Sequence, residues 1–286
     1  MKNILLPTDF SENSWNAIIY AIHFFKHLKC NFYLLHVNTP IYIETSEDSM
    51  PIYKNDINTL YVNNIKQRLR QLLKQISKLD TNYKDQNFYT LIETNFFING
   101  IRNTLEQKHI DYIVIGTKGA TGLEKLILGS NTADVITKVK CNTLIIPENA
   151  SYVIPKEIAL PTDFSLSHDL QVLQPIAKIL DQFKGTLRIL HINKNKVELN
   201  NEQQQNKELL EDFFNRHLYS FHYLTNKNIE DAIQCFIESR DINMVCMVAK
   251  NLNYFQQILF HSKVEHISYH TDIPFLVLHE KNENYG

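Results

Sequence analysis

Short apolar runs alternate along the chain with longer amphipathic stretches. In the first half, the apolar runs predict strands at residues 3–7, 31–37, 88–93, 112–115 and 143–146. Helical spacing of apolar residues predicts helices at residues 11–28, 60–79, 97–108 and 130–139. Ser11 is the expected N-cap of the first helix, and residues 38–58 are expected to form an inserted loop. Strands that are apolar on both faces and separated by helices indicate an α/β fold with a parallel sheet covered on both sides.

The second half has the same order of elements. Its predicted strands lie at residues 157–161, 186–192, 219–224, 244–248 and 275–279. Its predicted helices lie at residues 165–182, 200–216, 229–239 and 262–270. The two halves are therefore expected to fold alike.

An internal repeat explains this likeness. Residues 2–11 have the sequence KNILLPTDFS and residues 156–165 have KEIALPTDFS, an offset of 154 residues. The motif LLHV at 34–37 is similarly matched by ILHI at 189–192. Because the landmarks follow in the same order, we infer a duplicated domain. The predicted domains are residues 1–148 and 155–280, joined by the polar stretch Glu148–Pro155.

Composition and charge limit the functional classes. The chain has 286 residues, 44% of them hydrophobic and 21% charged, with a formal net charge of −2. These values are typical of a soluble protein, and the net charge favours neither nucleic acid nor an anionic membrane. The apolar runs are too short to span a bilayer and the N-terminus lacks a secretory signal, so a cytoplasmic location is expected. The four cysteines lack zinc-ribbon spacing and are expected to be small buried thiols.

Glycine is concentrated in one segment. The chain has seven glycines, and four of them, Gly116, Gly119, Gly122 and Gly129, follow the predicted strand at 112–115. Their pattern is G-x2-G-x9-G-S, and it leads into a helix that begins at Ser130. Glycines let backbone N–H groups turn toward an anion, and a helix N-terminus favours phosphate. The pattern therefore predicts a phosphate site at the carboxyl ends of the strands, where ligands of open α/β sheets bind.

These motifs together resemble the universal stress protein family. The N-terminal ILLPTDFS, the LLHV strand and the glycine pattern all match, and the resemblance extends over essentially the whole chain in a tandem form. The glycine pattern is the signature of the ATP-binding branch; it is neither a Walker A loop nor a G-x-G-x-x-G fingerprint. The resemblance implies two tandem adenine-nucleotide alpha hydrolase-like (Rossmann-like) domains. Each is expected to hold a five-stranded parallel sheet of order 3-2-1-4-5 with helices on both faces.

The resemblance also implies a ligand and its contacts. The ligand is ATP, AMP or another adenine nucleotide, with Asp9 near the ribose or base and the backbone of Val37 at the adenine. Asp9 is also a candidate Mg²⁺ ligand, while a simple helix-entry role for it stays open. The complete set of candidate binding residues is Pro7, Thr8, Asp9, Val37, Ile115, Gly116, Lys118, Gly119, Gly129, Ser130, Asn131 and Thr132.

The second copy departs from the glycine pattern. The positions of the four loop glycines are occupied in order by Val248, Asn251, Tyr254 and His261. A β-branched residue does not readily take positive φ, and large side chains would fill the phosphate space. The second domain is therefore predicted not to bind a nucleotide, with Asp163 serving as a cap of the helix expected at Ser165.

The function expected from the sequence is regulatory nucleotide binding in a stress response. No catalytic or metal-binding residues are predicted, and the sequence contains no catalytic-loop signature or nucleophile elbow. A slow ATPase and a ligand-free interaction scaffold stay open as alternatives. The resemblance implies that the predicted fifth strands, Thr143–Ile146 and Phe275–Leu278, meet in an internal pseudo-dimer, and a further homodimer and an unidentified protein partner stay open. The basic helix at residues 60–79 is interpreted as a solvated face, and neither nucleic acid nor a membrane is expected as a partner.

Overall fold

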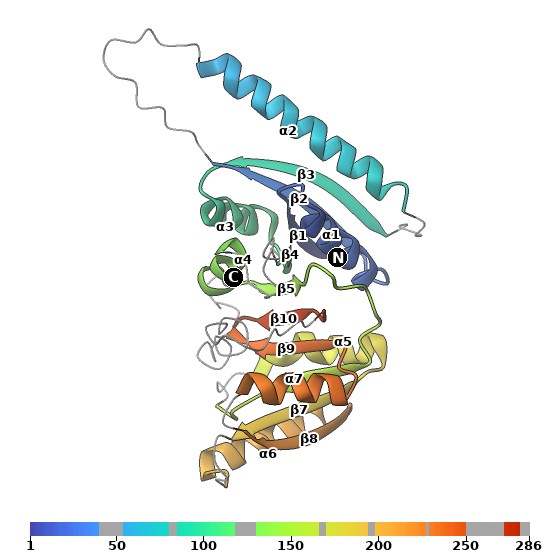
Figure 1. Ribbon diagram of the computed structural model, residues 1–286, viewed down its shortest axis with the longest axis vertical. Helices are drawn as coiled ribbons and strands as arrows, with labels where there is room; N and C mark the ends of the chain where they lie inside the picture. The colour runs from blue at the N-terminus through green and yellow to red at the C-terminus, as the bar shows by residue number, and fades with distance from the viewer. Residues whose placement is uncertain are drawn as a thin grey trace, which may run out of the picture. The chain divides into compact units, whose positions relative to one another are not determined.

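The computed structural model describes residues 1–39, 54–79, 85–117, 130–165, 170–193, 198–226, 229–249 and 272–280. Residue contacts divide the chain into two units, Met1–Ile115 and Gly116–Gly286. The elements of both units are labelled in Figure 1. Each unit is described by itself below.

The first unit is a parallel α/β structure. Its elements are β1 (Lys2–Pro7), α1 (Glu12–Phe24), β2 (Cys30–Asn38), α2 (Lys54–Ile76), β3 (Gln86–Thr94), α3 (Phe97–Lys108) and β4 (Tyr112–Gly116). The strands pair in the order β3-β2-β1-β4, all parallel. Ile4, Leu5 and Leu6 of β1 are fully buried because β1 is a central strand with neighbours on both sides. The predicted order 3-2-1-4 is thus confirmed.

Helix α1 begins as predicted. Ser11 is its N-cap and accepts a hydrogen bond from the Ser14 backbone N–H. The predicted apolar stripe is buried and consists of Ala17, Tyr20, Ala21 and Phe24. An N-cap hydroxyl satisfies one of the donors that the first helical turn leaves unpaired, and the stripe fixes the helix on the sheet.

Helix α2 differs from the prediction at its start. It begins at Lys54, although residues 38–58 were expected to form a loop. The first residues of α2 are mostly polar and carry little apolar periodicity, which is why the sequence pattern missed them. Its second half does follow the predicted stripe, with Ile65, Leu69, Leu72 and Ile76 buried.

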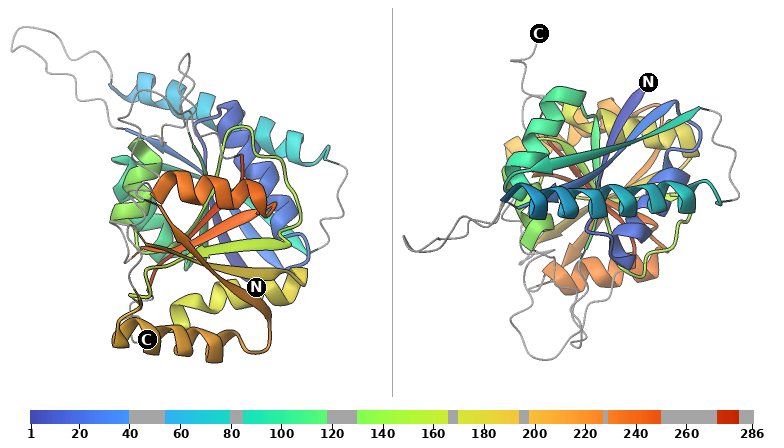
Figure 2. Two further views of the ribbon diagram at one scale, coloured as in Figure 1. Left: turned by 60° about the horizontal axis from the view of Figure 1, so that its bottom comes forward. Right: turned by 90° about the horizontal axis from the view of Figure 1, so that it is seen from above.

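The second unit contains the remaining elements. They are α4 (Ser130–Lys138), β5 (Asn142–Ile146), β6 (Glu157–Pro161), the 3-10 helix η1 (Leu170–Leu173), α5 (Gln174–Phe183), β7 (Thr186–Asn193), α6 (Asn201–Phe214), β8 (Leu218–Thr225), α7 (Ile229–Ser239), β9 (Met244–Val248) and β10 (Phe275–Leu278). The predicted helix at 262–270 lies outside the described residues. The helix predicted at 165–182 differs at its start: residues 166–169 lie outside the described residues, η1 occupies Leu170–Leu173, and α5 begins at Gln174. Pro175 in the first turn favours a helix start there. Figure 2 shows α7 lying across the strands of this unit.

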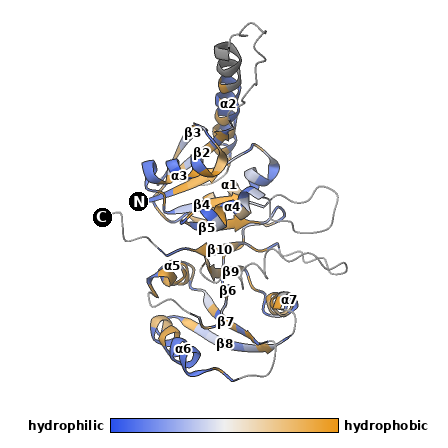
Figure 3. Ribbon diagram, turned by 90° about the vertical axis from the view of Figure 1, so that its left-hand side faces the viewer, coloured by the Kyte–Doolittle hydropathy of each residue, from blue (hydrophilic) through white to orange (hydrophobic). Residues whose placement is uncertain are grey.

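The strand order of the second unit is β5-β10-β9-β6-β7-β8. In repeat numbering, β8-β7-β6-β9-β10 is the predicted order 3-2-1-4-5. In Figure 3, α5 and α6 lie on one face of these strands and α7 lies on the other. The predicted fold class, an α/β sheet with helices on both faces, is confirmed.

The two predicted fifth strands pair with each other. β5 and β10 run antiparallel, with Leu144 opposite Leu276 and Ile145 opposite Phe275. The backbone N–H of His279 also donates to Asn142 Oδ1 at 3.1 Å. This pairing groups β5 with the second unit; the domain boundaries 1–148 and 155–280 stay a prediction.

The cysteines follow expectation with one exception. Cys30, Cys141 and Cys246 are buried, and burial raises the pKa of the Cys30 thiol to about 12. Cys235 is exposed on α7, so the expectation of a buried thiol is wrong there. Its position on the outer side of an amphipathic helix accounts for the difference.

Candidate nucleotide site

The chain makes a tight turn where β1 ends. The Thr8 backbone N–H still donates to the Leu35 carbonyl at 2.8 Å, as the next rung of the β1–β2 ladder. The side chain of Thr8 is buried, and its Oγ1 accepts from the Phe10 backbone N–H at 3.0 Å. Phe10 adopts a positive φ of 65°, an uncommon conformation for a residue with a side chain. The chain therefore leaves the sheet directly after Pro7.

His36 of β2 holds this turn from the neighbouring strand. Its Nδ1 donates to the Thr8 carbonyl at 2.8 Å, and its ring lies 4.8 Å from the Phe10 ring. The Arg68 guanidinium of α2 lies 4.1 Å from the same phenylalanine ring. Sequence reasoning used the LLHV motif for the internal repeat and for the resemblance, and missed its histidine as the support of the turn.

Asp9 is exposed and fixed by local hydrogen bonds. Its Oδ1 accepts from the Ser11 backbone N–H at 3.0 Å and from the Ser11 hydroxyl at 2.5 Å. Partial burial opposes ionisation, but hydrogen bonds from Ser11 and Ser14 outweigh it and lower the pKa of Asp9. The open helix-entry role is thus observed, because Asp9 positions the N-cap Ser11, and an ionised carboxylate remains at the carboxyl end of β1.

The backbone of Val37 points past the end of β1. Leu35 faces β1, because its carbonyl accepts from Thr8, while the Asn38 carbonyl accepts from Asn95 beyond β3. Since backbone groups alternate in direction along a strand, the N–H and C=O of Val37 point toward the β1 side. There the β1–β2 ladder has already ended, at Pro7 opposite Leu35. Hydrogen-bonding groups of this kind suit the edge of a planar base.

A second group of candidate residues lies where β4 ends. The Thr132 hydroxyl donates to the Gly116 carbonyl at 2.9 Å, and the Thr117 backbone N–H donates to the Ile146 carbonyl at 2.9 Å. Thr117 and Thr132 are both buried. The Thr132 bond holds the first turn of α4 at the end of β4, and the Thr117 bond joins the end of β4 to the end of β5. Ser130 and Asn131 are exposed.

The other candidates are placed as follows. Pro7 and Ile115 are buried at the ends of their strands. Lys118, Gly119 and Gly129 lie outside the described residues, as does Gly122. The glycine loop itself therefore stays a sequence prediction, bounded by Thr117 and Ser130.

The second repeat contains the same turn. The Thr162 N–H donates to the Leu190 carbonyl at 2.8 Å, and His191 Nδ1 donates to the Thr162 carbonyl at 2.9 Å. Phe164 has a φ of 57° and lies 4.8 Å from the His191 ring. The PTDFS repeat is therefore a repeat of three-dimensional structure as well as of sequence.

Helix α6 closes the turn in the second repeat. Gln203 Nε2 donates to the Asp163 carbonyl at 3.0 Å, and Asn206 Nδ2 donates to the Phe164 carbonyl at 2.7 Å. Phe164 is fully buried, whereas Phe10 is partly exposed. Sequence reasoning missed both amides, because nothing in their spacing indicates a target about forty residues away. The Asp163 carboxylate accepts from the Ser165 N–H at 2.9 Å.

Val248 ends β9 as Gly116 ends β4, in agreement with the predicted alignment. Asn251, Tyr254 and His261, the other three replacements of glycine, lie outside the described residues. The second repeat therefore both lacks the glycine pattern and has its turn hydrogen-bonded to α6.

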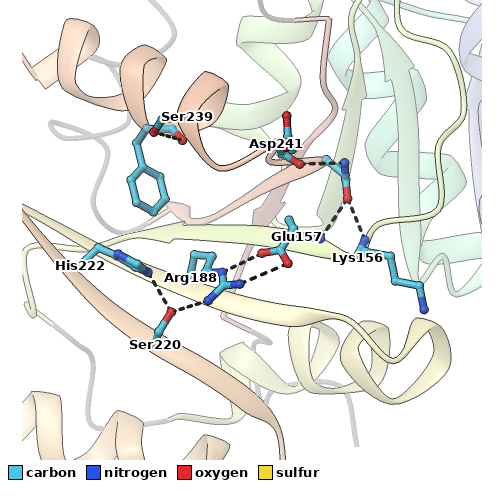
Figure 4. A network of polar contacts seen from close by, with 9 residues as sticks. Lys156, Glu157, Arg188, Ser220, His222, Ser239 and Asp241 are labelled. Carbon is cyan, nitrogen blue, oxygen red and sulfur yellow. Dashed lines mark hydrogen bonds and ion pairs between the residues drawn. The ribbon is translucent and has the colours of Figure 1, made fainter.

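One face of the second repeat carries a polar network at a position where the first repeat has an aromatic pair (Figure 4). Arg188 Nε donates to Glu157 at 2.7 Å, and the Arg188 guanidinium also donates to Ser220 Oγ at 2.9 Å. Ser220 in turn bonds to His222 Nε2 at 2.8 Å. Desolvation together with Arg240 and Arg188 lowers the pKa of His222, so its ring is neutral at neutral pH. The network ties β6, β7 and β8 together.

The equivalent rung of the first repeat is aromatic. Tyr33 and Tyr89 stand opposite each other on β2 and β3, and their rings stack at 5.2 Å. The LLHV and ILHI motifs align Tyr33 with Arg188. The two repeats thus fill the same position by different chemistry.

Two features of the described part of the chain concern metal binding and membrane crossing. No group of three or more His, Cys, Asp or Glu residues that could hold a metal ion occurs there. His261, His266 and His270 lie outside it. Within the same residues, no helix is long and apolar enough to cross a membrane.

Comparison with known families decides the assignment. The model of the universal stress protein family matches residues 1–147. The chain belongs to the universal stress protein family. It is 30% identical to universal stress protein MJ0531 of Methanocaldococcus jannaschii over 147 residues, covering 51% of this chain and 81% of that protein. It is 25% identical to universal stress protein YxiE of Bacillus subtilis, covering 51% of this chain and 98% of that protein.

Solved structures extend the likeness to both repeats. A universal stress protein from Archaeoglobus fulgidus matches with a TM-score of 0.65 at 16% identity, covering 96% of this chain and 97% of that chain. A second structure, described as a putative universal stress protein from Pseudomonas aeruginosa, matches with a TM-score of 0.58 at 12% identity, covering 97% of this chain and 93% of that chain. At these identities the likeness concerns the fold.

Proposed function

We propose that this universal stress protein binds ATP or a related adenine nucleotide in its first repeat, as a regulatory ligand in a stress response in the cytoplasm. The proposed binding residues are Pro7, Thr8, Asp9, Val37, Ile115, Gly116, Lys118, Gly119, Gly129, Ser130, Asn131 and Thr132. The second repeat is proposed to bind no nucleotide. We also propose that β5 and β10 join the two repeats as an internal pseudo-dimer.

The contrast between the two Thr-Asp-Phe turns carries this proposal. In the second repeat, α6 amides bond to the carbonyls of Asp163 and Phe164. In the first repeat, the aligned Phe10 is partly exposed and covered by the Arg68 guanidinium. The repeat whose turn has the partly exposed phenylalanine is also the one that keeps the glycine pattern. Two independent differences therefore favour the same repeat as the binding repeat.

Each described group has a suitable task toward a nucleotide. The Val37 N–H and C=O would pair with the edge of the adenine, as a donor and an acceptor side by side. The first turn of α4 would face the phosphates with its unpaired N–H groups and positive dipole end. Ser130 is exposed and its hydroxyl would donate to a phosphate oxygen, and Lys118 would add positive charge.

Asp9 would act as an anion near the ribose or the base, or as a ligand of Mg²⁺ on the phosphates. Its lowered pKa keeps the carboxylate ionised at neutral pH, which suits either a ribose hydroxyl donor or Mg²⁺. A bound Mg²⁺ would supply charge neutralisation on the phosphates. A nucleotide with different contacts in two conformations would then shift the balance between them, which is what regulation requires.

The ionised Asp9 also favours a second candidate function, a slow ATPase. Pure protein incubated with ATP and Mg²⁺ separates the two: several turnovers per chain that Asp9→Ala abolishes would favour the enzyme. Binding without turnover favours the regulatory ligand. If ATP, AMP and cyclic dinucleotides all leave the melting temperature unchanged, the chain is a ligand-free interaction scaffold and the proposal is wrong.

Paired variants test the site itself. Gly129→Val is expected to remove the rise in melting temperature that ATP produces, because a β-branched side chain at the helix entry blocks phosphate. Ser262→Ala, at the aligned position of Ser130 in the second repeat, is expected to leave the rise intact. Mass spectrometry of nucleotide carried through purification would identify the ligand.

A further inference from the structure

The outward face of α2 is a ridge of positive charge. The inward face is made of four buried side chains, Ile65, Leu69, Leu72 and Ile76. Lys66, Arg70 and Lys74 are exposed, and their i, i+4 spacing places them in one row. The sequence contains no Asp or Glu from residue 57 to residue 79. We call Lys66, Arg70 and Lys74 the α2 ridge.

The α2 ridge lacks compensating charge. Among the described residues, the ion pairs involve none of its three cations. Like charges at i, i+4 destabilise a helix, so the row opposes the stability of α2. A helix face that only contacts water gains nothing from this row of like charges, since a Glu at one of the three positions would remove the repulsion.

Helix α6 carries the opposite charge at the equivalent place of the second repeat, between its second and third strands. Its inward face is made of Gln203, Asn206, Leu210 and Phe214, which are buried or bonded to the turn. Glu202, Glu208 and Asp212 are exposed, and Leu209 between them is 46% exposed. We call these four outward residues the α6 face. Figure 3 colours much of α2 and α6 as hydrophilic.

We propose that the α2 ridge of one chain docks on the α6 face of a second copy of the same chain. The charges are complementary, and the two rows have similar lengths, about 12 Å from Lys66 to Lys74 and about 15 Å from Glu202 to Asp212 at the helical rise per residue. Leu209 would be removed from water within a rim of ion pairs, the usual anatomy of a small interface. The contact is heterologous, because two different faces meet.

The composition of the α2 ridge favours a protein partner over other anions. None of the residues between its cations, 67–69 and 71–73, is aromatic, whereas a strand-binding surface interleaves aromatic side chains for base stacking. Its apolar face is buried, so the helix cannot insert into a membrane interface as an amphipathic anchor does.

Sedimentation velocity of the full chain tests the proposal. We expect concentration-dependent association whose dissociation constant rises at least tenfold between about 20 mM and about 500 mM NaCl, because exposed ion pairs are screened. The triple variant Lys66→Glu/Arg70→Glu/Lys74→Glu is expected to weaken association at low salt by at least about tenfold. Glu202→Lys/Glu208→Lys/Asp212→Lys is expected to do the same.

The association of a mixture of these two variants is the decisive measurement. Each variant alone presents like charges on both faces, but the acidic α2 of one matches the basic α6 of the other, so the mixture is expected to associate. The matched control Lys26→Glu/Lys178→Glu/Lys184→Glu changes the net charge equally at exposed positions outside both helices and is expected to associate like the original chain. Far-ultraviolet circular dichroism checks that each variant is folded.

Three results would overturn the proposal. They are a chain that stays monomeric at low salt and high concentration, charge reversals that leave association unchanged, and a mixture that does not associate. If the α2 variant instead loses binding to a labelled polyuridylate while association is unchanged, the ridge serves nucleic acid and the proposal is wrong.

Discussion

The Thr132 hydroxyl donates to the Gly116 carbonyl at 2.9 Å, and through this bond the first turn of α4 is tied to the end of β4. Both residues belong to the candidate phosphate site. Thr132→Val keeps the shape of the side chain and removes the donor, leaving a buried carbonyl without this partner. We expect a loss of about 1 to 2 kcal/mol in the free energy of unfolding and about tenfold weaker ATP binding, measured by denaturant titration and calorimetry.

Thr137 provides the matched control in the same helix. Its hydroxyl donates to the Ala133 carbonyl at 2.8 Å, on the exposed side of α4. Thr137→Val is expected to change stability by less than about 0.5 kcal/mol, as exposed substitutions usually do, and to leave ATP binding unchanged. Equal losses of affinity in the two variants would contradict a specific role for the Thr132 bond.

A second prediction separates helix stability from anion binding. Ser130 is the exposed first residue of α4, and an acidic residue in the first turn stabilises a helix by about 0.3 to 1 kcal/mol. Ser130→Asp is therefore expected to keep or raise the melting temperature of the free protein. Its carboxylate would repel a phosphate, so the rise in melting temperature with ATP should disappear. A persistent ATP effect would place the phosphates elsewhere.

A third prediction concerns the packing of α3 on β2. A Cβ at Gly100 would lie 3.1 Å from both Val37 methyl carbons and 3.3 Å from Glu93 Cβ. Gly100→Ala gains about 1 kcal/mol of helix propensity, but overpacking costs about 1 to 3 kcal/mol, so we expect a net loss of about 1 kcal/mol. The same substitution should cost at least about 1 kcal/mol less in a Val37→Ala background. A double-mutant cycle by urea denaturation measures this coupling; additive effects would contradict it.

A fourth prediction concerns acid. Burial and the charge of Lys140 lower the pKa of His279 to about 4, from an ordinary value of 6.5. Between about pH 6.5 and pH 4 the unfolded chain takes up a proton that the folded chain does not, so this histidine lowers stability as the pH falls. The loss reaches about 3 kcal/mol at pH 4.

The variant His279→Gln tests the acid effect. It is expected to lose about 3 kcal/mol less than the original chain when both are unfolded with urea at pH 7 and at pH 4. Parallel pH profiles of the original chain and His279→Gln would contradict the assignment.

The regular elements were predictable where the apolar pattern was clear. α3, α7, β6 and β9 have the bounds expected from the sequence, because the two helices have apolar residues at helical spacing and the two strands are short apolar runs. The start of α2 at Lys54 was missed, since its first residues are mostly polar and carry little apolar periodicity.

The supports of the candidate site were not predictable. The Thr8, Phe10 and His36 cluster depends on a backbone at positive φ and on a partner in the next strand. Likewise, Asn206 reaches a carbonyl 42 residues earlier in the chain. Periodicity reports which face of an element is buried, and it carries no information on which polar atoms meet across elements. The repeats of PTDFS and of the LLHV motif were the sequence signals of this cluster.

The antiparallel pairing of β5 with β10 has a consequence for synthesis on the ribosome. Leu144, Ile145 and Ile146 of β5 are fully buried, and β10, their partner, begins at Phe275. A nascent chain therefore displays an apolar strand with an open edge while about 130 further residues are added, which takes on the order of ten seconds. Open apolar edges are sites of wrong pairing. The apolar edge of β5 in the newborn first repeat thus stays uncovered until β10, the last strand of the second repeat, has been made.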